Sequence, residues 1–375
     1  MPHLLDKLKS VRYKWLIPQL LLLLAIYLVF HRIAENVQAN MQSRGVALGF
    51  DFLSDRAGFG IIFHLIEYSS ASHYWQVFWV GVTNTLFVAV IGIFFASILG
   101  FWVGVSSISK SKPIALLAKS FVEIIRNIPL LLQLFFWYFV VLRAAPYPQD
   151  SIHIADSVFI TNRGIYFPKP IGSLYTTICL AFVFIMLGLS ALCAHLKKSW
   201  RHPIVILFVT LTICLFIIFL SQLTWERPLL GKFNFEGGYN LIPEFLALVF
   251  ALSTYTAAYI AEIVRMGLQS VPKGQYEAAR SLGLTRYQSL RLIIFPQALR
   301  VIIPPLTNQY LNLTKNSSLA TAIAYPDLVS VFAGTVLNQT GHAIEIILMT
   351  MGVYLFISLC LSLLMMAYER RVTWV

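Results

Sequence analysis

Several ionisable side chains lie inside strongly apolar stretches of this 375-residue chain, where a charge is costly and usually faces the interior of a helix bundle. Lys119, Glu123 and Arg126 are spaced by four and three residues, which places all three on one face of a helix. Because Glu123 can pair with both cations there, we expect a structural ion network. The alternative is a switch contact that exchanges partners during a conformational change, with Pro129 providing the bend.

A second polar cluster lies between residues 253 and 265. Tyr255, Tyr259 and Glu262 share one helical face by the 3.6-residue period, and we expect Glu262 to pair with Arg265. Hydroxyl groups and aromatic rings on this face are suited to line a passage for a zwitterion. The alternative is that they hold helices together, since Ser and Thr often hydrogen-bond between membrane spans.

A third polar run follows the adjacent prolines Pro304 and Pro305 and is too polar to face lipid. Interrupted backbone at membrane depth is tolerated only where protein or water satisfies it. Lys315 is suited to attract an α-carboxylate, and the alternative is that it extends to the outer interface. The translocation path or gate is predicted at Tyr255, Tyr259, Glu262, Asn308, Asn312, Lys315 and Ser317.

The sequence contains no arrangement of residues typical of catalysis. It has no GxxxxGK[ST] phosphate loop, so ATP is not expected to bind this chain in the usual way. Its eight histidines include no pair at metal-ligand spacing on a helix. The four cysteines are interpreted as small apolar residues. We therefore expect no catalytic residue, no metal site and no cofactor on this polypeptide.

Composition identifies a polytopic membrane protein. Hydrophobic residues make up 58% of the chain and charged residues 12%, whereas soluble domains carry about 25% charged residues. A helical span needs about 20 apolar residues, and the long continuous runs differ from the short alternating segments of membrane β-barrels. Eight candidate spans lie at about 15–31, 74–108, 114–142, 172–195, 203–222, 241–267, 294–314 and 342–368.

The net charge of +12 is explained by the way Lys and Arg are distributed between the loops that join these spans. With a cytosolic N-terminus, the Lys and Arg clusters fall on the inner side at every loop, as the positive-inside rule requires. Both termini are then expected to be cytosolic. The sequence has no patch of basic and aromatic residues that would predict nucleic-acid binding. The N-terminal run lacks a cleavage site and is interpreted as an uncleaved first span.

The chain divides into four predicted segments. Residues 1–73 hold the first span and an outer loop whose apolar patches predict a packed cap, and residues 74–143 hold the first two core helices. Residues 144–240 hold outer loops and two inserted spans interpreted as lipid-facing padding. Residues 241–375 hold the last three core helices, with a cytosolic loop at about 268–296.

That cytosolic loop has the sequence of a helix–turn–helix. Gly283 is suited to end the first helix, because glycine adopts the left-handed conformation without a Cβ clash. Thr285 and Gln288 fit a capping box at the start of the second helix. Pro296 lacks an N–H group and is expected to kink or end what precedes it.

The loop resembles the EAA loop of permease subunits of ABC importers. The spacing of Glu277-Ala278-Ala279, Gly283, Ile293 and Pro296 matches, with Phe295 where leucine is usual. Segments 122–133, 254–262 and 315–320 resemble the polar amino-acid branch. The N-terminal span and the inserted pair resemble the larger subunit of general L-amino-acid importers, which favour glutamate, glutamine, aspartate and asparagine.

This resemblance implies an all-α polytopic protein with the type I importer permease fold, in which five core helices are supplemented by one N-terminal and two inserted spans. It implies a bacterial inner-membrane location, an ABC ATPase dimer that binds ATP and Mg²⁺, a second permease subunit forming a heterodimer, and a periplasmic amino-acid-binding protein. The residues it assigns to ATPase coupling are Gln275, Glu277, Ala278, Ala279, Arg280, Gly283, Leu284, Thr285, Ile293 and Pro296.

Two other classes of protein fit the sequence less well. An ion-coupled secondary transporter would predict inverted repeats and buried acidic residues for ion coupling. The sequence shows no convincing repeat, and its interior acidic residues have cations nearby. A membrane-embedded enzyme or scaffold would need a catalytic arrangement that is missing here. The preferred amino acid is left open by the sequence.

Overall fold

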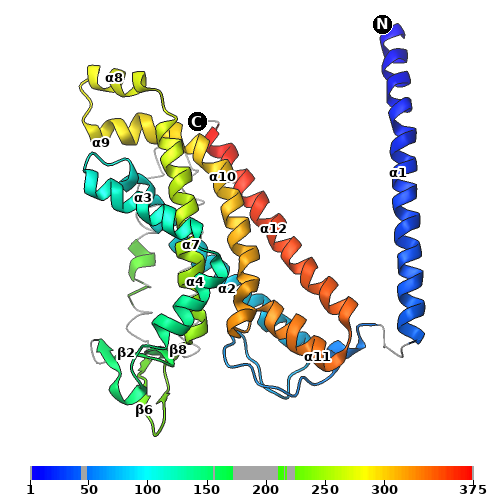
Figure 1. Cartoon of the computed structure of the whole chain (residues 1–375), viewed down its shortest axis with the longest axis vertical. Helices are drawn as coiled ribbons and strands as arrows, with labels where there is room; N and C mark the ends of the chain where they lie inside the picture. Colours follow the sequence, from blue (N-terminus) through cyan, green and yellow to red (C-terminus); the bar gives the residue numbers. More distant parts are fainter. Residues whose placement is uncertain are drawn as a thin grey trace. The chain divides into compact units, whose positions relative to one another are not determined.

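The computed structural model describes residues 2–43, 49–154, 157–171, 210–214, 216–217 and 224–373. The chain forms two compact units, each discontinuous in sequence. The first unit combines Met1–Leu86 with Pro326–Leu363, and the second combines Phe87–Tyr325 with Leu364–Val375. Helices dominate both units (Figure 1).

The expected five-helix core is present. Within the described residues, four helical runs are long and apolar enough to cross a membrane, and a helix pair bent by 104° makes a fifth when it is counted as one broken span. These spans are α2 (Tyr74–Ser107), the bent pair formed by α3 (Lys112–Asn127) with Leu130–Leu142, α7 (Pro243–Gln269), the run Tyr287–Ile323, and α12 (Ala343–Thr373).

The remaining predicted spans have different outcomes. Helix α1 (Pro2–Ser43) contains the apolar stretch Ile17–Ile33, where the first span is predicted. The inserted spans predicted at 172–195 and 203–222 lie largely outside the described residues, as do Cys179 and Cys193. Of the described cysteines, Cys214 and Cys360 are both free thiols.

The third predicted span is broken at Pro129, where a bend is expected. Helix α3 ends at Asn127, and the chain resumes as α4 (Leu130–Phe135) and the π-helical segment η2 (Phe136–Leu142). The Gln133 side-chain amide donates to the carbonyls of Ile125 and Ile128 at 2.8 and 2.9 Å. This buried amide satisfies backbone acceptors that the break would otherwise leave without partners.

Glycines allow α2 and α7 to pack closely in the second unit. A Cβ atom at Gly100 would lie 2.6 Å from the Cβ of Ile260, and one at Gly104 would lie 2.7 Å from the Cβ of Val264. Gly100 and Gly104 form a GxxxG pattern, which permits close backbone approach between membrane helices. The α7 helix also packs along α10 (Phe295–Asn316), as Figure 1 shows.

The outer loops of the second unit contain short β-strands, which the predicted all-α fold does not include. One antiparallel sheet has the order β1-β2-β3-β8, and two further pairs are β4-β5 and β6-β7. The strands are only two to four residues long, which is too short for an alternating hydrophobic pattern to predict them from the sequence. Their bounds are β1 Ile152–Ile154, β2 Val158–Thr161, β3 Gly164–Phe167, β4 Lys169–Ile171, β5 Thr224–Glu226, β6 Leu229–Leu230, β7 Phe235–Glu236 and β8 Tyr239–Leu241.

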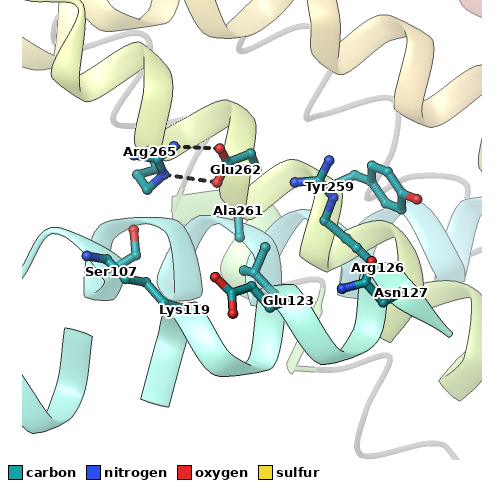
Figure 2. A pocket seen from close by; sticks show the side chains of 10 residues that line it. Ser107, Lys119, Glu123, Arg126, Asn127, Tyr259, Ala261, Glu262 and Arg265 are labelled. Atoms are coloured by element: carbon teal, nitrogen blue, oxygen red, sulfur yellow. Dashed lines mark hydrogen bonds and ion pairs between the residues drawn. The ribbon is translucent and has the colours of Figure 1, made fainter. Parts of the chain in front are cut away.

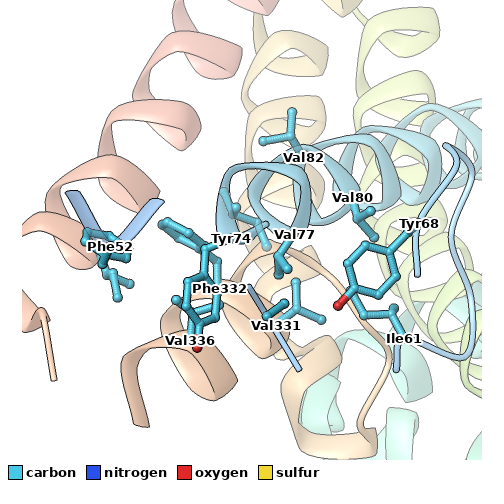
Figure 3. Packing of buried hydrophobic residues seen from close by; sticks show 13 residues of the cluster. Phe52, Ile61, Tyr68, Tyr74, Val77, Val80, Val82, Val331, Phe332 and Val336 are labelled. Atoms are coloured by element: carbon cyan, nitrogen blue, oxygen red, sulfur yellow. The ribbon is translucent and has the colours of Figure 1, made fainter. Parts of the chain in front are cut away.

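The first unit has its own hydrophobic core (Figure 3). Phe52, Ile61 and Tyr68 from the outer loop pack with Val77 of α2 and with Phe332. The packed cap predicted from apolar patches in this loop is therefore confirmed for the described part of the loop. The other contributors are the 3₁₀-helix η1 (Asp51–Ser54), the π-helical segment η6 (Val329–Val336), α11 (Leu337–Thr340) and the start of α12.

Candidate functional site

The predicted coupling loop is formed by α8 (Lys273–Ser281) and α9 (Arg286–Ser289), which lie near the end of α7 in Figure 1. Gly283 has a φ of +70°, as the glycine break predicts. Its N–H donates to the carbonyl of Arg280 at 2.9 Å, and the N–H of Leu284 donates to that of Ala279 at 3.1 Å. This pair of hydrogen bonds is the Schellman motif, which fixes the direction of the chain after α8.

The capping box at the start of α9 is also confirmed. The Thr285 N–H donates to Oε1 of Gln288 at 2.9 Å, and the Gln288 N–H donates to Oγ1 of Thr285 at 3.3 Å. The two reciprocal bonds satisfy two donors at the helix start. Glycine and capping box together define a rigid turn between the two helices.

Pro296 does not end the second helix. The π-helical segment η4 (Leu290–Ile294) leads directly into α10, and the N–H of Phe295 donates to the carbonyl of Leu290. Pro296 is the second residue of α10 and follows the π-helical segment directly, and the helical run Tyr287–Ile323 passes through it. The second helix therefore continues into the membrane span. The unusual Phe295 packs edge-on against Phe101 of α2, with ring centroids 5.7 Å apart.

Buried side chains and two hydrogen bonds tie the loop to the spans. Ala279 on α8 is fully buried, as is Ile294 just before α10. The Gln297 amide on α10 donates to the Gln275 side chain on α8 at 3.2 Å. The Tyr276 hydroxyl donates to the carbonyl of Leu268 near the end of α7 at 3.4 Å. Movement of α8 would therefore be transmitted to both α7 and α10.

The opposite face of the loop is exposed. Glu277 is open to solvent, and Leu282 and Tyr287 are 74% and 69% exposed. Two large apolar side chains are thus exposed on a loop that is otherwise polar. A pocket of about 470 Å³ adjoins this face; its lining is Ile108, Lys110, Lys273, Tyr276, Glu277, Arg280, Leu284, Ser289 and Leu290. The α2–α3 turn that carries Lys110 was not predicted to belong here.

A second pocket, of about 510 Å³, unites the first and second polar clusters (Figure 2). It opens between α3 and α7 beside the end of α2. Sequence spacing placed each cluster on its own helix face, and the structure turns the two faces toward each other. The lining residues are Ser107, Lys119, Val122, Glu123, Arg126, Asn127, Tyr259, Ala261, Glu262 and Arg265.

The charges in this polar pocket are paired on α7 but not on α3. Arg265 donates to Glu262 through Nε at 2.9 Å and through Nη2 at 2.5 Å, as expected. By contrast, no ion pair within 4.0 Å links Lys119, Glu123 and Arg126 to one another in the described part of the chain. The predicted ion network on α3 is therefore not formed, because these side chains are exposed and an exposed pair gains little.

Arg126 contacts an aromatic ring and has no ion pair within 4.0 Å among the described residues. Its guanidinium carbon lies 4.9 Å from the centre of the Tyr259 ring, a cation–π arrangement visible in Figure 2. The Tyr259 hydroxyl lies 3.2 Å from that of Tyr255. The predicted face of α7 is thus directed toward α3, while its neighbours Ala258 and Ile260 are buried in the core.

The third polar cluster is largely exposed on α10. Asn308, Asn312 and Lys315 all lie on the exposed side of the helix, together with both prolines. Ser317 is different, because its side chain is fully buried and donates to the carbonyl of Thr314 at 2.7 Å. Ser317 is therefore not on the exposed side of α10, because a hydroxyl at a helix end readily bonds back to its own backbone. Its role in the path stays a prediction.

Apolar helical runs of this length, with an exposed helical loop between two of them, are the architecture of a polytopic membrane protein. Residues 92–374 match the family described as binding-protein-dependent transport system inner membrane component, and the chain belongs to this family. It is therefore a multi-pass transport subunit of an ABC importer of the inner membrane and not an enzyme. Membership implies an ATPase and a binding protein as partners.

Three relatives match this chain over nearly its whole length. The "Putative amino-acid ABC transporter permease protein YhdX" of Escherichia coli K12 is 50% identical, covering 96% of this chain and 93% of the relative. The general L-amino acid transport system permease protein AapQ of Rhizobium johnstonii is 44% identical, with 97% and 93% covered. The glutamate/glutamine/aspartate/asparagine transport system permease protein BztB of Rhodobacter capsulatus is 35% identical, with 97% and 94% covered.

Sequence reasoning missed one functional feature of the second unit for which a signal existed. The GxxxG pattern at Gly100 and Gly104 brings α2 onto α7 and so helps to set the position of the polar pocket. Its i, i+4 glycine spacing inside an apolar span is readable from sequence. The closeness of Arg126 to Tyr259 has no such signal, because the two residues lie on different helices far apart in the chain.

Proposed function

We propose that this chain is the larger permease subunit of an ATP-driven importer for polar L-amino acids such as glutamate, glutamine, aspartate and asparagine. It forms the translocation path together with a second, related permease subunit, and both of its termini are cytosolic. The relatives named above, of which one carries these four amino acids in its name, support the substrate class. The observation that carries the proposal is the coupling loop with its exposed outer face and its fixed inner face.

In this proposal α8 docks in a cleft of a separate ATPase dimer, where ATP and Mg²⁺ bind. Glu277 is exposed and carries no ion pair within the described residues, so it is free to meet a basic group of the ATPase. Closure of the ATPase dimer moves α8, and the contacts of Gln275 and Tyr276 pass that movement to α10 and α7.

The exposed face of α10 is the proposed lining of the path. Asn308, Asn312 and Lys315 lie on a membrane-spanning run and are too polar to contact lipid. They are therefore expected to face water or the second permease subunit. A periplasmic amino-acid-binding protein delivers the substrate to the outer loops, and Lys315 at the end of α10 is placed to attract its carboxylate.

The test is uptake of L-glutamine into proteoliposomes that contain the complete importer and its binding protein. Glu277→Lys is expected to abolish both uptake and the stimulation of ATP hydrolysis by the loaded binding protein. The matched control is Glu226→Lys, which changes an exposed glutamate on the outer strand β5. Stimulated hydrolysis that persists in Glu277→Lys contradicts the coupling role. Uptake driven by an ion gradient without the ATPase contradicts the function itself.

A further inference from the structure

We propose that the polar pocket between α3 and α7 is a binding site for a zwitterionic L-amino acid on the exit side of the permease. This inference rests on the proposed amino-acid transport and adds a site separate from the face of α10. The pocket adjoins the coupling loop, because Arg265 lies one turn before the end of α7 and donates to Gln269 at 2.8 Å. Helix α8 begins at Lys273.

The dimensions of the pocket suit a small metabolite. Its volume of about 510 Å³ falls within the range of roughly 300–1,000 Å³ found for small-molecule sites. Val122 and Ala261 are buried and apolar, and the short side chain of Ala261 leaves space between the two helices. Polar and charged groups make up the rest of the lining, so the pocket is more polar than a typical small-molecule site and suits a charged ligand.

Charges within the pocket match the two ends of an amino acid. Glu262 is neutralised by its bidentate contact with Arg265, so this pair has little capacity for a ligand. Glu123 and Arg126 are neighbours on one face of α3 and form no ion pair with each other or with any other described residue. In our proposal the α-ammonium group binds Glu123 and the α-carboxylate binds Arg126.

Arg126 is held in a position that leaves its donors available. The guanidinium carbon lies 4.9 Å from the centre of the Tyr259 ring, and a cation–π contact of this kind does not use up the N–H donors of the guanidinium. A carboxylate can then accept two parallel hydrogen bonds from these donors, a geometry in which arginine is superior to lysine. The neighbouring Tyr255 hydroxyl, 3.2 Å from that of Tyr259, steadies the ring.

The charge balance of the pocket also indicates a preference among side chains. Its lining carries three cations, Lys119, Arg126 and Arg265, against two carboxylates, Glu123 and Glu262. The one excess positive charge favours a ligand with a neutral or acidic side chain over one with a basic side chain. Lys119 lies one turn before Glu123, where it can meet an acidic or amide side chain.

The experiment measures protection of a cysteine placed in the pocket. The importer, in which the four native cysteines of this chain are replaced by serine, is studied in nanodiscs without nucleotide and without binding protein. Asn127→Cys lies in the pocket lining, and Ser111→Cys at the start of α3 is the exposed control outside it. L-glutamine is expected to slow maleimide labelling of Asn127→Cys and to leave Ser111→Cys unaffected. L-arginine is expected to protect less well.

Substitutions of the charged residues then test the assignment. Arg126→Gln and Glu123→Gln are each expected to raise the half-protecting concentration of L-glutamine about tenfold or more, the usual effect of losing a hydrogen bond to a charged group. Arg126→Lys is expected to restore part of the protection, because lysine keeps the positive charge but lacks the paired N–H donors. Lys112→Gln, which removes a charge from α3 outside the pocket, is expected to match the unsubstituted protein.

Three results would overturn the inference. The first is that L-glutamine does not protect Asn127→Cys from labelling. The second is that the half-protecting concentration is unchanged in both Arg126→Gln and Glu123→Gln. The third is that Arg126→Gln separates the permease subunits while protection persists. The last result would assign Arg126 to a contact with the partner subunit. The labelling assay contains neither ATP nor binding protein, so it tests ligand binding separately from transport. If the importer shows protection but does not transport L-glutamine, the proposed function is contradicted and the binding site is not.

Discussion

At the scale of single residues, Gly283 carries the geometry of the coupling loop. Its φ of +70° lies in the left-handed region, and a Cβ added there would have no heavy atom within 4 Å. Only backbone strain therefore opposes a side chain, at a cost of about 1 kcal/mol for alanine. Proline is incompatible, because its φ is fixed near −65° and it lacks the N–H that donates to Arg280.

These two substitutions make a matched pair. We expect Gly283→Ala to retain most of the ATP-driven uptake of L-glutamine and Gly283→Pro to lower it on the order of tenfold or more. Uptake into proteoliposomes is the measurement, with co-purification of the ATPase showing whether the complex still assembles. Equal uptake by the two variants would show that the turn does not transmit force.

Asp327 is a buried carboxyl group in the first unit. Burial raises its pKa from the ordinary 3.8 to about 7, although the N–H of Ser330 at 2.8 Å and the Tyr354 hydroxyl at 3.3 Å favour the charged form. The folded protein therefore holds this proton more tightly than the unfolded chain. Its contribution to stability is full below the unfolded pKa and is lost as the pH rises through about 7.

The expected result is a protein that is more stable at mildly acidic pH. The melting temperature of the purified complex at pH 5.5 and pH 8 measures this difference, and Asp327→Asn is expected to reduce it because asparagine cannot ionise. Asp150→Asn is the control, since Asp150 is exposed. A pH dependence identical in Asp327→Asn and the unsubstituted protein would mean that other groups produce it.

At the scale of elements, contact between α2 and α7 depends on two glycines. A Cβ at Gly104 would lie 2.7 Å from both the Val264 Cβ and the Ala261 carbonyl oxygen. Gly104→Val is therefore expected to lower stability by about 1–3 kcal/mol through overpacking. The measurement is thermal denaturation followed by size-exclusion chromatography. Gly352→Val on α12 is the control, because nothing lies within 4 Å of its added Cβ; an equal loss there would argue against specific packing.

Helix α10 allows a separate test of the translocation path. Asn312→Leu and Lys315→Ala remove exposed polar groups from the proposed lining, and each is expected to lower the rate of L-glutamine uptake by about tenfold, as expected for loss of a hydrogen bond to a charged substrate. Ser317→Ala is expected to transport at a nearly normal rate, since its hydroxyl only bonds the Thr314 carbonyl. Unchanged rates in both Asn312→Leu and Lys315→Ala would exclude this face from the path.

At the scale of the whole molecule, features encoded by neighbouring residues were predictable. Gly283 and the Thr285–Gln288 capping box act over a few residues, so their pattern specified the coupling loop in detail. Hydropathy located the core spans for the same reason. Contacts between distant helices were not predictable: spacing along α3 suggested that Glu123 would pair with Arg126, whereas packing of α7 against α3 gave Arg126 the Tyr259 ring.

The whole chain is also expected to be incomplete as a transporter. Its sequence has no phosphate-binding loop, and the exposed polar face of α10 needs water or another subunit beside it. We therefore expect the purified chain alone to give no uptake in proteoliposomes, with activity restored by the ATPase and the second permease subunit together. Uptake by the chain alone would contradict the proposal that transport needs a separate ATPase and a second permease subunit.

The pairing of β4 with β5 has a consequence for how such a chain can be altered. Ile171 lies directly opposite Thr224, so the backbone leaves the outer sheets and returns to them at adjacent positions. A hairpin turn of two residues can close such antiparallel neighbours. A shorter or foreign segment that joins Ile171 to Thr224 is therefore compatible with the register of the β4–β5 ladder.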